Sequence, residues 1–249
     1  MSLQGKRALI TGAGQGIGRA IAAELHGLGV ELVLLGRRRE PLEELRITVP
    51  GEIVLADVSR PDEVERARQQ AGGVDILVNN AGIAHSAPVK SLRLLDWERL
   101  MATNATGLML MCQAFLPSMA ERGWGRIVNI ASVAARAGGK YLAAYAASKH
   151  AVLGFTRSLA EEVAAQGITV NAVCPGFVDT PMTEQTLANI MAKTGMSRED
   201  AEKSLTRFNP QGRLIEAEEV AYWVGCLCHP RGRGVNGQAL ILDGGGLLA

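Results

Sequence analysis

The chain has 249 residues, of which 47% are hydrophobic and 20% charged, and its formal net charge is +1. The hydrophobic share is too high for a disordered chain, and the balanced charge excludes the basic surface of a nucleic-acid binder. No apolar run reaches the roughly 18–20 residues of a membrane span, so we expect one globular domain over residues 1–249.

Short strand-like runs alternate with amphipathic helical patterns along the chain, and several of the runs are continuously apolar. Strands are expected at Arg7–Thr11, Glu31–Leu35, Glu52–Ala56, Ile76–Asn79, Arg126–Ile130, Thr169–Val173 and Ala239–Leu242. Helices are expected at Gly16–Leu28, Glu40–Arg46, Pro61–Gln70, Asp96–Arg122, Ala144–Gln166 and Ala217–Cys228. Continuously apolar strands are typical of a parallel sheet buried on both faces. The order predicts a doubly wound α/β fold with about seven strands and helices on both faces.

The first strand is followed by a glycine-rich turn with the sequence TGAGQGIG, over Thr11–Gly18. Glycines let the backbone approach a pyrophosphate, and the N-terminus of the next helix offers it unpaired N–H groups. The spacing is TGxxxGxG rather than GxGxxG. We expect a dinucleotide to contact Gly12, Gln15, Gly16, Ile17 and Gly18.

The ends of the second and third strands bear on the type of dinucleotide. Arg37 stands where an NAD-binding fold usually has an acid for the ribose 2′-hydroxyl, and a guanidinium matches a 2′-phosphate. This favours NADP(H), although Arg37–Arg39 is also the pattern of a solvated helix start, which leaves NAD(H) open. Asp57 and Val58 follow the third strand, where Asp57 either accepts a bond from adenine or caps the next helix.

Two further turns lie at the strand ends. After the fourth strand, Asn80, Ala81 and Gly82 leave room for a ribose, or form an ordinary turn. After the sixth, the turn Pro175–Thr180 is placed to cover a nicotinamide ring. Contacts are then expected from Pro175, Gly176, the Val178 backbone and the Thr180 hydroxyl.

The chemistry is expected after the fifth strand. Tyr145 and Lys149 are one helical turn apart and share a face, so the ammonium should lower the phenol pKa and let Tyr145 act as general acid or base. Ser132 would hold the substrate oxygen. Asn104, in the middle of a predicted helix, either bonds internally or supports a water chain to Lys149.

Together these motifs resemble the short-chain dehydrogenase/reductase family, in its form of about 250 residues. The terminal Leu242–Gly245 also matches, and the motifs appear in the family's order along essentially the whole chain. The resemblance implies a Rossmann-type three-layer α/β/α fold, hydride transfer at a nicotinamide, and a catalytic set of Asn104, Ser132, Tyr145 and Lys149. It assigns the proton-relay water to Asn104 and the nicotinamide ribose to Lys149, which with Tyr145 also counts among the cofactor contacts. It further implies a homotetramer.

The segment Thr180–Pro210 is polar, Met-rich and helical in pattern, and forms either a surface insertion or a lid over the strand ends. Its position favours the lid. Substrate contacts are expected from a mostly apolar set: Ser86, Ala134, Tyr141, Phe177, Met182 and Leu187.

The sequence leaves the substrate open. An NADPH-linked carbonyl or 3-oxoacyl reductase, acting on a small ketone or an acyl thioester, is favoured over an NAD-dependent hydroxyacyl or alicyclic alcohol dehydrogenase. A non-catalytic dinucleotide sensor is least favoured, because it would not need Tyr145 and Lys149. The four cysteines form no CxxC pair, so we expect no metal site, no disulfide framework and a cytoplasmic location.

Overall fold

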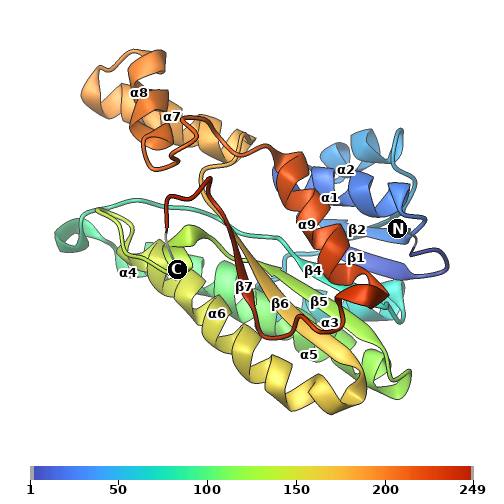
Figure 1. Ribbon diagram of the computed structural model, residues 1–249. Helices are drawn as coiled ribbons and strands as arrows, with labels where there is room; N and C mark the ends of the chain where they lie inside the picture. The colour runs from blue at the N-terminus through green and yellow to red at the C-terminus, as the bar shows by residue number, and fades with distance from the viewer. Residues whose placement is uncertain (1–2, 248–249) are drawn as a thin grey trace.

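The computed structural model describes residues 3–247, which contain a seven-stranded parallel sheet in the order β3-β2-β1-β4-β5-β6-β7 (Figure 1). The strands are β1 Arg7–Thr11, β2 Glu31–Gly36, β3 Glu52–Leu55, β4 Ile76–Asn79, β5 Gly125–Ile130, β6 Ile168–Pro175 and β7 Ala239–Leu242. The predicted doubly wound α/β fold is confirmed, and the predicted strands match these within two residues at each end.

Helices cover both faces of the sheet (Figure 1). They are α1 Gly16–Gly27, α2 Arg39–Arg46, α3 Pro61–Ala71, α4 Leu94–Met101, α5 Gly107–Glu121, α6 Ala143–Val163, α7 Pro181–Thr194, α8 Arg198–Thr206 and α9 Ala217–Cys228. Successive residues of a strand point to opposite faces. Leu9 of β1 therefore joins the core beneath α3, α5 and α6, whereas Ile10 joins the core beneath α1, α2 and α9.

The strand order reverses between β1 and β4, and at such a point ligands bind beyond the carboxyl ends of the strands. The two strand ends are joined there by side-chain hydrogen bonds. The Thr11 hydroxyl accepts from the backbone N–H groups of Asn80 and Ala81, both at 2.9 Å. The Asn80 side chain donates to the Thr11 carbonyl, also at 2.9 Å. The glycine-rich turn and the turn after β4 are thus held as one unit.

The long helix expected at Asp96–Arg122 is interrupted. It begins at Leu94 with α4, passes through a π-helical turn at Ala102–Thr106 and continues as α5 to Glu121. A π-turn inserts an extra residue into the helical repeat and is frequent at functional sites. Asn104 lies in this turn, so the irregularity of the helix coincides with a predicted site residue.

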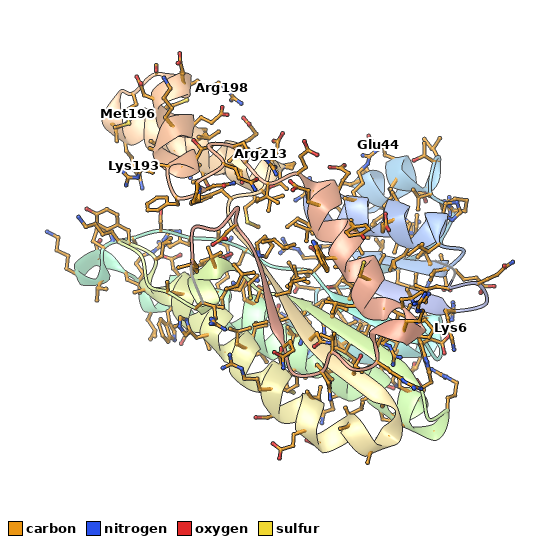
Figure 2. The ribbon with its side chains drawn as sticks, viewed as in Figure 1. Lys6, Glu44, Lys193, Met196, Arg198 and Arg213 are labelled. Carbon is orange, nitrogen blue, oxygen red and sulfur yellow. The ribbon has the colours of Figure 1, made fainter. Side chains whose placement is uncertain are left out.

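The segment between β6 and α9 forms the helical pair α7–α8, which projects beyond the body of the molecule (Figure 1). Its core consists of Leu187, Ala201 and Leu205, with Phe177 packed against them. A bidentate ion pair joins Arg198 to Glu184, with both N–O distances at 2.7 Å. Figure 2 shows Arg198 with Lys193 and Met196 on this projecting part, far from Lys6 at the other end of the molecule.

Candidate active site

The glycine-rich turn leaves the N-terminus of α1 open to a ligand. Gln15 precedes the helix in an extended conformation, and its side chain makes no capping hydrogen bond. Gly12 has a φ of +66°, and a Cβ there would lie 3.0 Å from the Asn80 amide nitrogen. A Cβ on Gly18 would overlap the Gly12 carbonyl oxygen. Glycine is therefore required for packing at Gly12 and Gly18, while the uncapped N–H groups and the helix dipole fit a phosphate.

Two arginines flank this turn. The Arg38 guanidinium donates to the Gln15 side chain at 3.3 Å, and Arg37 lies 3.7 Å from the carboxylate of Asp57. The Arg37 side chain is 65% exposed, so its charge remains accessible to a ligand. The sequence pointed to Arg37, whereas the contact of Arg38 with Gln15 was not anticipated, since nothing in the run of three arginines distinguishes Arg38.

Asp57 has local partners of its own. Its carboxylate accepts from the Ser59 N–H at 3.0 Å and from the Ser59 hydroxyl at 2.7 Å. Burial acts to raise the pKa of Asp57, but the Ser59 hydrogen bonds and the charge of Arg37 outweigh it and hold the pKa below its ordinary value. Asp57 thus closes a local turn onto Ser59 and does not cap α3, whose N-cap is Arg60 with no side-chain capping bond. Val58 is buried against the backbone of Gly107, where a Cβ would lie 2.8 Å from Val58 Cγ2.

Asn104 uses its carboxamide to hold neighbouring elements. Its oxygen accepts from the Ile83 N–H at 2.9 Å, and its nitrogen donates to the Ile83 carbonyl at 2.9 Å and to the Ser148 hydroxyl at 3.0 Å. These are internal bonds of the kind the sequence allows, and the support of a water chain to Lys149 stays a prediction. A Cβ on Gly82 would lie 3.3 Å from the Asn104 oxygen and 3.6 Å from Lys149 Nζ. Gly82 therefore lies beside both the Asn104 carboxamide and the Lys149 ammonium.

Ser132, Tyr145 and Lys149 come together from β5 and α6. Ser132 follows β5, and its hydroxyl accepts from the Ala134 N–H at 3.1 Å. The Lys149 ammonium donates to the carbonyl of Ile130, the last residue of β5, at 2.8 Å and lies 6.0 Å from the centre of the Tyr145 ring. The two predicted acid–base residues therefore share a face of α6 that is turned toward the end of β5.

The electrostatics of Tyr145 differ from the expected lowering by Lys149. Burial raises the pKa of Tyr145 above its ordinary value, and interaction with the Ser132 hydroxyl opposes the rise. Burial also lowers the pKa of Lys149 to about 8. The expectation failed because helical spacing gives the closeness of two groups but not the cost of burying them, and this cost dominates here.

The turn after β6 reaches both the glycine-rich turn and the α7–α8 segment. A Cβ on Gly16 would lie 3.1 Å from Thr180 Cγ2, so the two predicted cofactor-binding turns meet at these residues. The Thr180 side chain caps α7 by accepting from the Thr183 N–H at 3.4 Å, and Val178 is buried. Pro175 ends β6, and the Gly176 N–H donates to the Leu242 carbonyl at 2.8 Å.

The expected substrate contacts divide into exposed and packed residues. Ser86 and Met182 are exposed, Tyr141 is exposed with an unusual φ of +67°, and Phe177 is half-buried. The Tyr141 carbonyl accepts from the Ala87 N–H at 2.9 Å, which joins the loops after β4 and β5.

Two residues of that set are packed away. Ala134 is 8% exposed. Leu187 is fully buried in the core of the α7–α8 segment, so it packs that segment and presents no surface to a substrate. The helical pattern of Thr180–Pro210 did not reveal which side of α7 faces α8.

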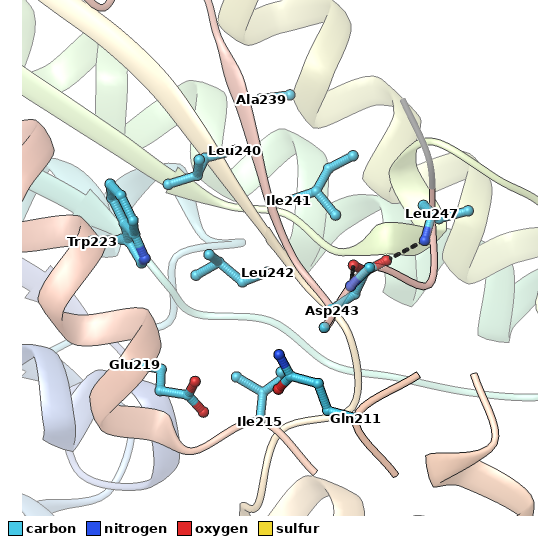
Figure 3. Close-up of a pocket in the computed structure, with 12 residues that line it drawn as sticks. Gln211, Ile215, Glu219, Trp223, Ala239, Leu240, Ile241, Leu242, Asp243 and Leu247 are labelled. Atoms are coloured by element: carbon cyan, nitrogen blue, oxygen red, sulfur yellow. Dashed lines mark hydrogen bonds between the residues drawn. The ribbon is translucent and has the colours of Figure 1, made fainter. Parts of the chain in front are cut away.

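A pocket of about 460 Å³ lies beside β7, α9 and the end of the chain (Figure 3). Trp223, Ile215, Gln211 and Asp243 are among its lining residues, and Ser132, Tyr145 and Lys149 are not. Within residues 3–247 there is no group of three or more His, Cys, Asp or Glu side chains placed to hold a metal ion. No helix in the same range is long and apolar enough to cross a membrane.

The chain is similar in sequence and in structure to known proteins. The family described as short chain dehydrogenase matches residues 6–190. A 3-oxoacyl-[acyl-carrier-protein] reductase of Pseudomonas aeruginosa is 38% identical, with 98% of each chain covered. A D-beta-hydroxybutyrate dehydrogenase of Cupriavidus necator is 34% identical, again over 98% of each chain. The crystal structure of an actinorhodin polyketide ketoreductase variant with NADPH superposes with a TM-score of 0.92 at 39% identity, covering 98% of each chain.

Proposed function

The chain belongs to the short-chain dehydrogenase/reductase family, and within it we propose an NADPH-linked ketoreductase that converts the ketone of an oxoacyl-type substrate to a secondary alcohol. The family makes the protein an NAD(P)-dependent oxidoreductase acting on CH–OH groups. The observation that carries the finer proposal is the arrangement of Ser132, Tyr145 and Lys149 at the end of β5, with Arg37 and Arg38 beside the glycine-rich turn.

The residues present fit a nicotinamide dinucleotide. The uncapped N-terminus of α1 would hold the pyrophosphate, and Arg37 with Arg38 would hold a 2′-phosphate on the adenosine side. The turn Pro175–Thr180, which meets the glycine-rich turn at Gly16, would lie against the nicotinamide. When bound, the nicotinamide supplies the hydride for reduction.

The catalytic side chains then act on the substrate oxygen. Ser132 would donate a hydrogen bond to the carbonyl oxygen, and Tyr145 would give that oxygen its phenolic proton. Lys149, fixed on the Ile130 carbonyl, would keep a positive charge near the phenol as the phenolate develops. Burial raises the pKa of Tyr145, so the phenol keeps the proton that this role requires.

The alternative is an NAD-dependent hydroxyacyl or alicyclic alcohol dehydrogenase. It is favoured by the Arg37–Asp57 ion pair, because a carboxylate 3.7 Å from the guanidinium offsets part of the charge offered to a 2′-phosphate. Within residues 3–247 no carboxylate forms an ion pair with Arg38, and its bond to the Gln15 amide leaves its charge uncompensated. This difference favours NADPH over NADH.

A cofactor titration separates the two functions. The purified protein is titrated with NADPH and with NADH, with fluorescence of Trp97, Trp124 and Trp223 as the signal. The proposal predicts tighter binding of NADPH by about 10-fold or more, as expected for a charge-assisted phosphate contact, followed by turnover of 3-oxoacyl thioesters or simple ketones. Tighter binding of NADH would instead support the dehydrogenase.

A homotetramer in the cytoplasm completes the proposal. It is supported by the family relationship. Sedimentation of the purified protein measures the assembly state directly.

A further inference from the structure

We propose that Asp243 is a positioning residue that folds the end of the chain into a support for the α7–α8 segment. The support is the C-terminal turn, Asp243–Leu247. The α7–α8 segment, Pro181–Thr206, acts in this proposal as a lid over the substrate. The inference rests on the proposed function for what the lid covers, but the contacts that carry it do not depend on the substrate.

The carboxylate of Asp243 shapes the turn. It accepts from three backbone N–H groups, those of Gly245 at 3.0 Å, Gly246 at 3.1 Å and Leu247 at 2.7 Å. Figure 3 shows the bond to Leu247. The Asp243 side chain is buried, with 7% of the residue exposed, and its charge strengthens all three bonds, although Gly245 and Gly246 themselves are exposed. The turn therefore has a defined shape that a single side chain maintains.

The base of the lid rests on this turn at two glycines. A Cβ on Gly244 would overlap the side-chain oxygen of Asn209, and a Cβ on Gly246 would overlap the carbonyl oxygen of Phe208. Phe208 and Asn209 lie two and three residues after the end of α8, and the Asn209 N–H donates to the Thr206 carbonyl at 2.8 Å. The two segments therefore pack too closely for a side chain at either glycine. The bond from Asn209 to Thr206 connects this contact to the last turn of α8.

The other side of the turn touches the loop proposed to hold the nicotinamide. A Cβ on Gly176 would lie 3.2 Å from Asp243 Cβ, and the Gly176 N–H donates to the Leu242 carbonyl at 2.8 Å. The C-terminal turn thus lies between the root of the lid, after β6, and its return, after α8. A displacement of the turn would move these two ends relative to each other.

The C-terminal turn also borders the pocket beside β7. Gly244, Gly245 and Leu247 line this pocket of about 460 Å³, together with Trp223 (Figure 3). Without the Asp243 carboxylate the turn is expected to lose its defined shape, and the lid would lose the surface on which Phe208 and Asn209 rest. The position of the lid over the substrate is therefore set by the C-terminal turn.

Two neighbouring glycines provide a matched test. Gly246→Ala places a methyl group against the Phe208 backbone, whereas at Gly245 a methyl group meets no described atom within 4 Å. Gly245 has a φ of +93°, so Gly245→Ala strains the turn without touching the lid. The comparison separates contact with the lid from general strain in the turn.

The readout is amide hydrogen exchange of α7 and α8 in the protein with bound NADPH. We expect exchange in these helices to rise about 10-fold or more in Gly246→Ala and to change less than about 3-fold in Gly245→Ala, with exchange in β1–β6 unchanged in both. KM for a ketone substrate is expected to rise in Gly246→Ala by a larger factor than kcat falls. The proposal would be overturned if hydrogen exchange in α7 and α8 rose equally in the two variants. It would also be overturned if exchange in these helices were unchanged in Gly246→Ala.

Asp243→Asn supplies the second variant if Gly246→Ala does not fold. An amide keeps the size of the side chain but accepts fewer hydrogen bonds, so lid exchange should rise by an intermediate amount. Unchanged lid exchange in a folded Asp243→Asn protein would also overturn the proposal. Hydrogen exchange needs no turnover, so a protein that reduces no ketone would contradict the proposed function while leaving this test intact.

Discussion

The Lys149 ammonium donates a hydrogen bond of 2.8 Å to the carbonyl of Ile130, which joins the catalytic face of α6 to the last residue of β5. Lys149 is 6% exposed, and burial lowers its pKa to about 8. A buried ammonium with no carboxylate beside it is costly to the folded state. We interpret Lys149 as a residue retained for chemistry at the expense of stability.

Replacing Lys149 should therefore stabilise the protein. The pKa of about 8 lies below the ordinary 10.5, so the unfolded state binds this proton more tightly, and stability falls as the pH drops from about 10.5 to about 8. The difference of about 2.5 units corresponds to about 3 kcal/mol at neutral pH, from which the lost bond to Ile130 subtracts about 1 kcal/mol. Lys149→Met is expected to unfold at higher urea concentration than the wild type at pH 7, with the gap closing toward pH 10.

The exposed Lys140 provides the control for this prediction. Lys140→Met should leave stability within about 0.5 kcal/mol of the wild type at both pH values. A Lys149→Met protein less stable than the wild type at pH 7 would show that the ammonium contributes net stabilisation.

Arg37→Ala should weaken NADPH far more than NADH. Removal of a charge-assisted bond to a 2′-phosphate costs about 1.5–3 kcal/mol, or roughly 10- to 150-fold in Kd, and NADH has no phosphate at this place. The substitution also removes the ion pair of Arg37 with Asp57, but an exposed ion pair contributes little energy. NADH binding is therefore expected to change less than about 3-fold. Isothermal titration with both cofactors measures the two effects, and equal losses would place Arg37 outside the phosphate site.

Leu187→Ala tests the packing role that the structure gives this residue. Leu187 is fully buried against Ala201 and Leu205, so the cavity should destabilise the α7–α8 pair by about 2–5 kcal/mol. Cleavage within Pro181–Thr206 by a protease should become faster while the sheet stays protected. Met196→Ala, at an exposed position of the same segment, is the matched control. If Leu187→Ala leaves the cleavage rate unchanged, Leu187 does not hold α7 and α8 together, and the predicted contact with the substrate would be favoured instead.

The fold was largely predictable because its signals are local. Apolar runs such as Leu9–Ile10 are continuous in a sheet buried on both faces, and α9 is bounded as expected at Ala217–Cys228. Glycine-rich and polar turns at the strand ends are local signals as well. They placed the candidate site at the carboxyl edge of the sheet, where the strand order reverses.

The remaining features depend on contacts between distant segments. Asn104, in the π-turn, is bonded to Ile83 and Ser148, which are 21 and 44 residues away. The burial of Leu187 depends on α8. The sign of the Tyr145 pKa shift depends on how much the surrounding residues desolvate the phenol, which no spacing in the sequence encodes.

In the proposed reaction Tyr145 gives its proton to the substrate carbonyl of the NADPH-bound enzyme, and Tyr145→Phe removes only that proton. The wild type and the variant are each saturated with NADPH and mixed with a 3-oxoacyl thioester, and the loss of NADPH absorbance is followed over one turnover. We predict that the rate falls by at least about 10²-fold, because general acid catalysis contributes about 10²–10⁴, while Kd for NADPH changes less than about 2-fold. A variant that keeps more than a few per cent of the wild-type rate would contradict the assignment of Tyr145 as the proton donor.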